Sequence, residues 1–367
     1  MNPPSPFHAA AVVTRGEGVD AWHAAAVAVV DGRGRVTHTR GDADLITFTR
    51  SAIKPLQALP LCLTGARDTL GIDDEELALA AASHDGGDVQ RAIAGRLLVK
   101  AGARADQLLC GAHWPIGMRV AGQHPCAGED RDPLRHNCSG KHAGFLCLAC
   151  ALHRGPNLRQ YVRGYVAPDH PVMRAVTAAL QAATDFDLAT APRGTDGCSI
   201  PTYGIPLRRL ALALARVGTG VGLRPGHAQA ARRLRQAVAR FPLMVSGSGR
   251  FDSRVMQRLG ERVFCKVGAE GVYCAALPER GLGIAIKIDD GNNARASEVV
   301  MAAAIEALLR LSDDDAAFMR TFSDATLRNW NRIEVGALRA APPLREALAR
   351  VGDAGTAVSV PSARPLT

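Results

Sequence analysis

Strand-like segments lie at both ends of this 367-residue chain and enclose a long helical region. Near the N-terminus, residues 8–13 and 23–39 are rich in β-type residues, and an Asp-Gly turn within the second segment predicts a hairpin. Strand patterns return at 262–268, 271–277 and 282–288, separated by glycine-containing turns. The economical arrangement is one antiparallel sheet built from both ends of the chain.

Between these strands, apolar residues recur three and four positions apart, which is the spacing of a helix face. The predicted fold class is α/β (α+β), and 47% hydrophobic residues can fill a sizeable core. We expect a single domain at 1–355 followed by a loose tail at 356–367. Its parts are a sheet from about 8–39 and 262–288, a helical middle region at about 51–241, and C-terminal helices at 293–351.

Charge and composition exclude several classes of protein. The net charge of +9 is spread over the whole length, aromatic residues make up 4%, and no dense basic block would follow a nucleic-acid backbone. No segment reaches the roughly 18 apolar residues of a membrane span, and the first ten residues lack a signal-peptide pattern. The nine irregularly spaced cysteines fit reduced thiols. We expect a cytoplasmic protein with a small-molecule partner, no nucleic acid and no membrane.

Lysine is rare in this chain. Of 44 basic residues only five are lysines, namely Lys54, Lys100, Lys141, Lys266 and Lys287. Arginine stays protonated in proteins, whereas a desolvated lysine can lose its proton and act as a base or a metal ligand. Three of the five fall inside compact motifs, so the sequence favours lysine where a proton must be lost.

The first motif is Ser51-x-x-Lys54. If a helix begins near Ser51, the lysine lies one turn further on the same face and its amine can touch the hydroxyl. A neutral lysine can then take the proton of a nucleophilic serine. This spacing also occurs by chance in many proteins, and a serine at a helix start is commonly only a cap.

Two further residues strengthen the first motif. Ser83 ends a helical run and enters a glycine-rich loop, and Lys266 ends a strand just before Val267-Gly268. Taken separately, they could be a turn serine and a solvent-facing lysine. In this order and context the three motifs match the triple of penicillin-binding proteins and class A β-lactamases, which favours a catalytic role. The segment "SHDGG" lacks the asparagine expected two residues after the serine, which argues against a β-lactam substrate.

A second constellation combines Cys138 and Lys141 at a helix start with Cys198 in a glycine-flanked loop. Two thiolates with nitrogen or carboxylate ligands suit a tetrahedral zinc ion, and a helix N-terminus helps to ionise Cys138. Two packed thiols in turns are an equally good interpretation of the bare chemistry. Lysine is a rare zinc ligand, and more conventional candidates lie nearby: His136, His142 and Asp196.

The stretches "RSAIKPLQA", "SHDGGD", "NCSGKHAGF", "TDGCSIPT", "KVGAEG" and "IKIDDGN" resemble the rhizobial-type (thermolabile or inducible) L-asparaginase II family. They run from residue 50 to 293. The resemblance implies a serine hydrolase with a penicillin-binding-protein/β-lactamase-like fold that acts as a homodimer. It also implies hydrolysis of L-asparagine to L-aspartate and ammonia through an acyl-enzyme.

The resemblance also implies roles for individual residues. The catalytic positions form two Ser-Lys pairs around one amide: Ser51, Lys54, Ser83 and Lys266. Zinc is implied at Cys138, Lys141 and Cys198, with water completing the site. As substrate-binding candidates we take Arg50, His84, Asn137 and Asp196; Arg50 could hold a substrate carboxylate or make a structural ion pair. Departures from the family pattern are Asp85-Gly86-Gly87 and Arg135, the latter where some relatives carry another cysteine.

Two other classes of function stay open. One is a different amidohydrolase of the same fold, such as a glutaminase or a penicillin-recognising serine hydrolase. The other is a non-catalytic protein that binds zinc or an amino acid. The presence of both serines and both lysines favours an enzyme.

Overall fold

The computed structural model describes residues 5–120, 122, 131–153, 155 and 157–353. The chain forms two compact units. The sheet unit comprises Met1–Leu45, Pro206–Gly222 and Glu270–Thr367, and the helical unit comprises Ile46–Ile205 and Leu223–Ala269. Each unit is thus assembled from segments far apart in the sequence. The proposed tail at 356–367 lies outside the described residues, and the expectation of a single domain stays a prediction.

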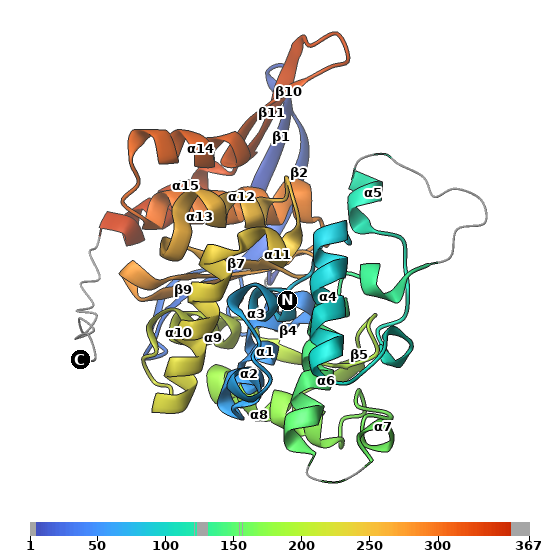
Figure 1. Cartoon of the computed structure of the whole chain (residues 1–367). Coiled ribbons are helices and arrows are strands. Elements are labelled where there is room, and N and C mark those ends of the chain that lie inside the picture. The colour runs from blue at the N-terminus through green and yellow to red at the C-terminus, as the bar shows by residue number, and fades with distance from the viewer. Residues whose placement is uncertain (1–4, 121, 123–130, 154, 156, 354–367) are drawn as a thin grey trace. The chain divides into compact units, whose positions relative to one another are not determined.

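The sheet unit contains an antiparallel sheet in the order β10-β11-β1-β2-β9-β8, with β3 also paired to β2 (Figure 1). Its strands are β1 (His8–Arg15), β2 (Gly18–Asp31), β3 (Val36–Arg40), β8 (Val272–Leu277), β9 (Leu282–Ile288), β10 (Asp324–Arg328) and β11 (Glu334–Ala340). The pairing of β2 with β9 joins the two ends of the chain, with Val27 opposite Ile286. This confirms the expected mixed α/β fold with an antiparallel sheet built from both termini.

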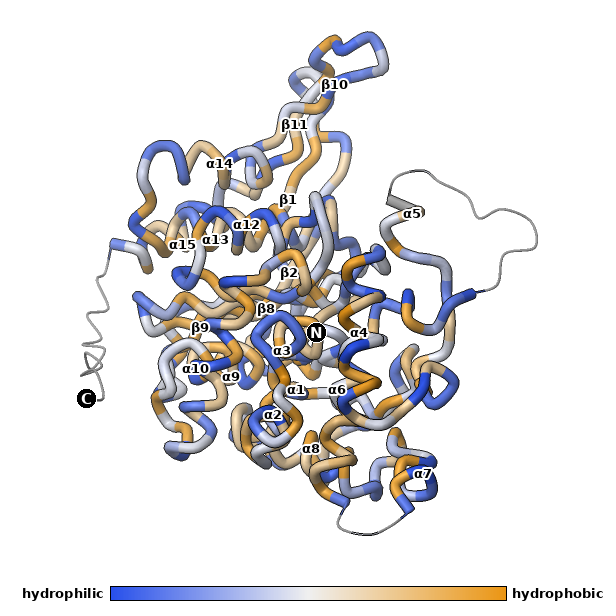
Figure 2. Tube along the Cα trace, viewed as in Figure 1, coloured by the Kyte–Doolittle hydropathy of each residue, from blue (hydrophilic) through white to orange (hydrophobic). Residues whose placement is uncertain are grey.

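Helices pack on this sheet. They are α9 (Leu207–Thr219), the short 3₁₀-helix η5 (Pro278–Arg280), the π-helix η6 (Asn293–Ser297), α13 (Glu298–Leu308), α14 (Asp313–Ser323) and α15 (Pro342–Asp353). Strands β8 and β9 are almost entirely buried and are drawn in the hydrophobic colour along most of their length in Figure 2. Helix α9 contacts β2, β8 and β9, and α13 packs Val299 and Ala303 against Ala11 and Ala340.

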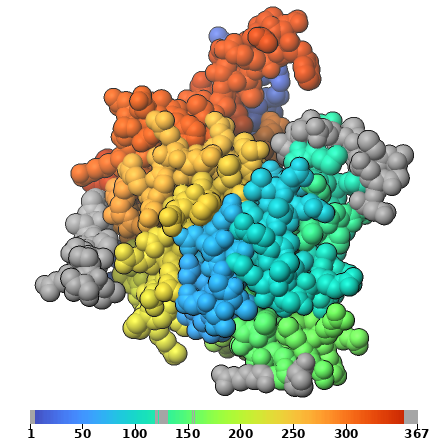
Figure 3. All heavy atoms as spheres, viewed as in Figure 1, coloured from blue at the N-terminus to red at the C-terminus, as the bar shows by residue number. Residues whose placement is uncertain are grey.

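The region expected to be helical from 293 to 351 also contains two strands, β10 and β11. Their hairpin, orange-red in Figure 3, projects from the rest of the sheet unit. Residues of β10 alternate between exposed and half-buried, so the sequence of this strand carries only a weak pattern of alternating hydrophobicity. Strand β11 is instead held by β1, where Ala11 lies opposite Ala340. Pairing with a segment more than 300 residues away therefore decides its conformation, and helical periodicity cannot reveal that.

The helical unit is built mainly of helices, as the apolar periodicity predicts. They are η1 (Arg50–Ile53), α1 (Lys54–Leu63), α2 (Ala66–Thr69), α3 (Asp74–Ala80), α4 (Asp88–Lys100), η2 (Ala105–Gln107), α5 (Ile116–Val120), η3 (Pro133–Arg135), α6 (Ser139–Leu152), α7 (Leu158–Tyr161), α8 (Pro171–Thr184), α10 (Pro225–Arg240), α11 (Pro242–Ser246), α12 (Phe251–Leu259) and η4 (Gly260–Arg262). It also contains β7 (Phe264–Val267) and a small sheet that the sequence did not indicate: β4 (Ile46–Phe48), β6 (Pro201–Pro206) and β5 (Arg193–Thr195), in that order.

Helix α6 forms the centre of the helical unit. Every residue from Ser139 to Ala149 is buried, and the helix contacts α1, α3, α4 and α8. Gly140 permits a close approach to α3, because a Cβ atom there would lie 2.6 Å from the carbonyl oxygen of Leu79. The start of α6 is therefore held deep inside the unit.

Within the described part of the chain, no helix combines the length and the apolar character that crossing a membrane requires.

Close packing of α9 on β9 predicts a large effect of one added methyl group. A Cβ atom at Gly283 would lie 1.9 Å from the carbonyl oxygen of Ala211, so Gly283→Ala must displace backbone. We expect it to lower the free energy of unfolding by more than about 2 kcal/mol, measured by urea denaturation.

Gly95→Ala is the matched control, because Gly95 lies inside α4 with no atom within 4 Å of the added Cβ. It should raise stability by about 0.5–1 kcal/mol, since alanine favours a helix interior. Equal stability of the two variants would contradict the close contact of α9 with β9.

Candidate active site

All of the candidate site residues lie in the helical unit. The 3₁₀-helix η1 carries Ser51 and leads directly into α1, whose first residue is Lys54. The two residues therefore lie at a helix start, as the sequence pattern indicates. Lys54 is fully buried, whereas Ser51 is only partly buried.

The Lys54 amine binds the second serine of the predicted set. Its Nζ donates to Ser83 Oγ and to the carbonyl oxygen of Ala82, both at 2.7 Å. Among the hydrogen bonds of the described residues, none joins Nζ to Ser51 Oγ. Lys54 thus links the helix that begins at η1 to the segment that follows α3. Spacing along one helix could not show this, because Ser83 reaches the amine from a different element.

Burial is the main influence on the charge of Lys54. It lowers the pKa of the amine, and the positive charge of Lys141 lowers it further. The sulfur of Cys138 opposes both effects by favouring the protonated form, but the pKa of Lys54 still stays below its usual value. A lysine in this setting can supply a neutral amine, which is the form that accepts a proton.

The segment containing Ser83 is fixed on both sides. Its backbone N–H donates to Val245 O at 2.8 Å, and the next residue, His84, is completely buried. His84 Nδ1 accepts from Gly86 N–H at 3.1 Å, and Nε2 lies 3.0 Å from Ser139 Oγ. Burial lowers the pKa of His84 to about 3, so the ring is neutral and Nε2 carries the proton. His84 holds this loop in place, and its contact with a substrate stays a prediction.

Lys266 is buried, not solvent-facing. Its Nζ donates to Val267 O at 2.8 Å and lies 3.8 Å from Asp252 Oδ2. Burial lowers the pKa of Lys266 to about 7, although the Asp252 carboxylate favours the charged form. This lysine can therefore gain or lose a proton near neutral pH.

Cys138, Lys141 and Cys198 converge in the buried region at the start of α6. Lys141 Nζ donates to Cys198 Sγ at 3.0 Å, and the two sulfur atoms share a hydrogen bond. That bond, together with the nearby Lys54 and Lys141 amines, lowers the pKa of Cys138 well below its usual value. Burial disfavours a charged Lys141, but the two sulfurs outweigh it and raise its pKa. The group is best described as a thiolate on Cys138 facing an ammonium ion.

The donor set decides whether this group suits a metal. Among the described residues, no cluster of three or more histidine, cysteine or acidic side chains is placed to hold one. His136 Nδ1 accepts from the backbone N–H of Cys138 at 2.9 Å, and His142 Nδ1 lies 2.6 Å from the hydroxyl of Tyr165. The third donor beside the two sulfurs is therefore the Lys141 amine. Two thiolates suit zinc, and the Lys141 amine would complete the set as a ligand only after losing its proton, so the zinc site stays a prediction.

Arg50 makes an ion pair with Asp196, with Nε 2.7 Å from Oδ1. The Arg50 backbone adopts a φ of 47°, a conformation that costs a side-chain-bearing residue about 1–3 kcal/mol. Burial would raise the pKa of Asp196, but its bond to Arg50 prevails and keeps the carboxylate ionised. Asp196 Oδ2 also lies 3.6 Å from Cys198 Sγ, so this pair connects the Ser51 segment to the sulfur group.

Asn137 lies between two histidines. Its backbone N–H donates to His113 Nε2 at 3.2 Å, and its carbonyl oxygen accepts from His84 N–H, also at 3.2 Å. It therefore supports the loop that follows Ser83. Its predicted role in substrate binding is not decided by these contacts.

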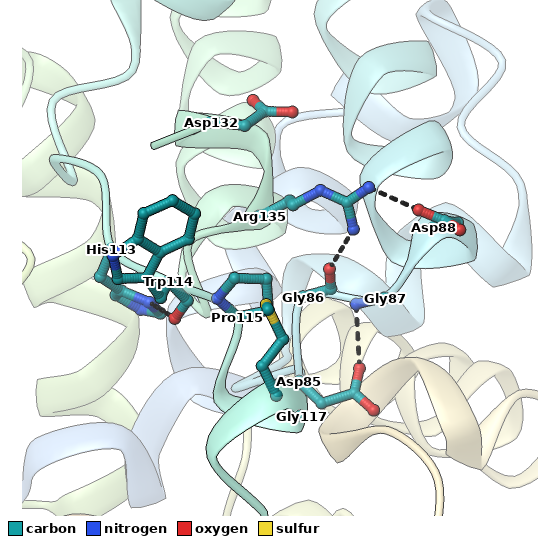
Figure 4. A pocket seen from close by; sticks show the side chains of 11 residues that line it. Asp85, Gly86, Gly87, Asp88, His113, Trp114, Pro115, Gly117, Asp132 and Arg135 are labelled. Carbon is teal, nitrogen blue, oxygen red and sulfur yellow. Dashed lines mark hydrogen bonds and ion pairs between the residues drawn. The ribbon is translucent and has the colours of Figure 1, made fainter. Parts of the chain in front are cut away.

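A cleft of about 640 Å³ opens beside this loop (Figure 4). It is lined by Asp85, Gly86, Gly87, Asp88, His113, Trp114, Pro115, Gly117, Met118, Asp132 and Arg135. Arg135, a departure from the family pattern, donates to Gly86 O at 2.9 Å and pairs with Asp88. These described lining residues do not include the two serines and two lysines. The cleft therefore adjoins the Ser83 loop without containing the predicted catalytic groups.

Comparison with known proteins decides the family. The family model described as L-asparaginase II matches residues 11–340. The chain belongs to this family. A search of curated proteins found no match.

The similar solved structures share little sequence identity with this chain. "Mglu in its native form" is 19% identical with a TM-score of 0.35, and the match covers 79% of this chain and 66% of that one. A β-lactamase from Mycobacterium bovis is 16% identical with a TM-score of 0.38, covering 77% and 93%. A second Mglu structure is 18% identical with a TM-score of 0.32, covering 74% and 64%. The chain thus spans less than two thirds of either Mglu structure, and these scores carry no argument about its activity.

The lowered pKa of Lys266 predicts how stability depends on pH. In the folded protein this amine loses its proton near pH 7, whereas the unfolded chain holds it up to about 10.5. The unfolded state binds more protons between these values, so this lysine makes stability rise with pH across that window. Lys266→Met should lose this rise.

Urea unfolding midpoints of the wild type and Lys266→Met at pH 7 and about pH 9.5 measure the effect. The wild type should gain stability relative to the variant at the higher pH. If the unfolding midpoints of the two proteins differ by the same amount at both pH values, the lowered pKa of Lys266 would be contradicted.

Proposed function

We propose that the protein is an L-asparaginase that hydrolyses L-asparagine to L-aspartate and ammonia through an acyl-enzyme. The observation that carries this proposal is the buried Lys54 amine 2.7 Å from Ser83 Oγ. Family membership supports amide hydrolysis. A buried amine beside a hydroxyl, with a second buried lysine in the same unit, supplies the groups that acyl transfer requires.

In the proposed first half-reaction, Ser51 Oγ attacks the side-chain amide carbon and its proton passes to the neutral Lys54 amine. The carbon–nitrogen bond then breaks, and the leaving nitrogen takes a proton from Lys266. Ammonia departs and an ester on Ser51 remains. The bond between Lys54 and Ser83 supports the next step, in which Ser83 passes a proton from Lys54 towards Lys266 and so restores both lysines.

In the second half-reaction, Lys54 accepts a proton from the attacking water. The hydroxide adds to the ester carbon, and Ser51 recovers its proton from Lys54 as aspartate leaves. The two lysines thus work in opposite protonation states, Lys54 as the base and Lys266 as the acid. Their different surroundings support this division, because Lys266 has a carboxylate nearby and Lys54 bonds a hydroxyl and a carbonyl oxygen.

The substrate is a zwitterionic amino acid, which needs one cation and one anion. We assign Arg50 to its α-carboxylate and Asp196 to its α-ammonium group, since these two residues lie together beside Ser51. His84 and Asn137 are proposed to complete the site by shaping the loop after Ser83. The homodimer implied by the resemblance and the cytoplasmic location expected from the sequence stay predictions.

Zinc is proposed as a cofactor held by Cys138, Lys141 and Cys198. When bound, it would tune substrate affinity or order the loop that carries Cys198. Ser-Lys chemistry does not itself require a metal, so we assign zinc a supporting role. The convergence of the Lys141 amine and two sulfurs supports the ligand set.

The function is tested by ammonia release from L-asparagine and L-glutamine, measured on the wild type and on Ser51→Ala. We expect release from asparagine, and a loss of at least about 10²- to 10⁴-fold in turnover on substitution, because no nucleophile remains. Mass spectrometry of a trapped reaction should find the acyl group on Ser51. Preference for glutamine would make the protein a glutaminase, and an acyl group on Ser83 would reverse the roles of the serines.

Lys54→Arg is the control for the base. Arginine keeps the positive charge but cannot supply a neutral amine, so this variant should be nearly as inactive as Ser51→Ala. Near-normal turnover of Lys54→Arg would overturn the proposed mechanism. Binding of asparagine without ammonia release by the wild type would indicate a non-catalytic protein.

The zinc proposal predicts about one zinc ion per chain in the purified protein, measured by elemental analysis. Cys198→Ser should lose the metal, because a hydroxyl is a poor ligand beside one remaining thiolate. The matched control is Cys147→Ser, which alters a buried thiol elsewhere on α6 and should keep the metal. Equal zinc content in Cys198→Ser and the wild type would contradict the proposed zinc site.

A further inference from the structure

A buried carboxylate lies behind Lys266. Asp252, in the first turn of α12, is only 1% exposed. Its Oδ2 accepts from the Ser246 hydroxyl at 2.7 Å and from Val267 N–H at 3.2 Å, and it lies 3.8 Å from Lys266 Nζ. A buried acidic side chain is costly unless it is hydrogen-bonded and paired with a positive charge. The geometry meets both conditions and points to Lys266 as the partner.

Lys266 needs such a partner if it is to carry a proton. Its side chain is 0% exposed, so water cannot stabilise the ammonium form. The charged and titratable groups that act on it are Asp252, Lys54, Arg250 and Cys138. Arg250, and Lys54 whenever it is protonated, disfavour a positive charge on Lys266. Asp252 is the carboxylate in the set, and it exerts the largest effect after burial itself.

We propose that Asp252 is a positioning residue for Lys266: its carboxylate, held by Ser246 and Val267 N–H, provides the negative charge that allows Lys266 to carry a proton in the buried site. The same contacts fix the end of β7 that carries Lys266, because Val267 N–H donates to the same oxygen. Asp252 and Ser246 lie outside the sequence motifs.

The segment from α11 to α12 also holds the loop of the second serine. Val245 O accepts from Ser83 N–H at 2.8 Å, and Ser248 N–H donates to Asp85 Oδ2 at 3.3 Å. Gly247, with a φ of 97°, passes so close to Asp85 that a Cβ atom there would lie 2.1 Å from its carboxyl carbon. Residues 245–252 therefore position Ser83 through its backbone and Lys266 through Asp252. One short segment sets the geometry of both groups.

This inference rests on the proposed function for its catalytic consequence, but the pairing itself can be measured without turnover. The protein has five lysines, so their side-chain ¹³Cε resonances are few, and Lys266→Met assigns the signal of Lys266. Titration of the wild type should place its midpoint near neutral pH. An opposite charge within about 4–6 Å shifts a pKa by about 1–3 units, so Asp252→Asn should lower the midpoint by at least about one pH unit.

Asp85→Asn is the matched control, because it removes a carboxylate from a neighbouring contact of the same segment and should leave the midpoint in place. The ¹³Cγ signal of Asp252 in the wild type gives a second measurement that needs no variant. It should shift over the same pH range in which Lys266 titrates. The proposal would be overturned if Asp252→Asn left the titration midpoint of Lys266 unchanged. It would also be overturned if the ¹³Cγ signal of Asp252 did not shift over the pH range in which Lys266 titrates.

Turnover supplies the final arm of the test. Since Lys266 acts as the acid, Asp252→Asn should move the alkaline limb of the pH–rate profile to lower pH, and Asp252→Glu should partly restore it by keeping the charge. If Asp252 had only a structural role, Asp252→Asn would lower activity without moving the alkaline limb of the pH–rate profile. If the wild type hydrolyses no amide, the proposed function fails, while the two NMR measurements still decide whether Asp252 sets the protonation of Lys266.

Discussion

The structure of the helical unit depends on the burial of three lysine amines. Lys54, Lys141 and Lys266 are each at most 2% exposed, although an ammonium ion loses most of its hydration in such a place. Each amine is stabilised differently. Lys54 bonds a hydroxyl and a carbonyl oxygen and also lies near the Cys138 sulfur, Lys141 bonds the Cys198 sulfur, and Lys266 lies near a carboxylate. These different partners push the protonation of the three lysines in different directions, which is what acid and base roles in one site require.

Packing around α6 brings these lysines within range of one another's charge. The absence of a side chain at Gly140 lets α6 approach α3, so Cys138 and Lys141 at its start lie close to Lys54. The segment after α3 then delivers Ser83 to the Lys54 amine. The Ser83 hydroxyl and the candidate metal site thus share one electrostatic environment, in which a change of charge at the sulfur group alters the pKa of Lys54.

Sequence patterns selected candidate reactive groups but did not reveal all of their partners. The rare lysines in compact motifs are buried in the structure, and the two strand-rich ends correctly indicated an antiparallel sheet. The partnership of Lys54 with Ser83 was not visible, because spacing along a helix describes only neighbours on that helix. Asp252 was missed for the same reason: it meets Lys266 across α12 and β7, and no local pattern marks an aspartate in a first helical turn as a buried counter-charge.

The sequence by itself determined the fold class and the family and selected the candidate reactive residues, since these follow from residue types, their order and periodicity. Tertiary structure alone decided the charge state of each lysine, because desolvation and distance to other charges exist only once the chain is packed. It also decided strand β11, which pairs with β1, and strand β4, which pairs with β6, because in both cases the partner lies far away in the sequence. Hydrogen bonds between segments far apart in sequence leave no periodic signal in either segment.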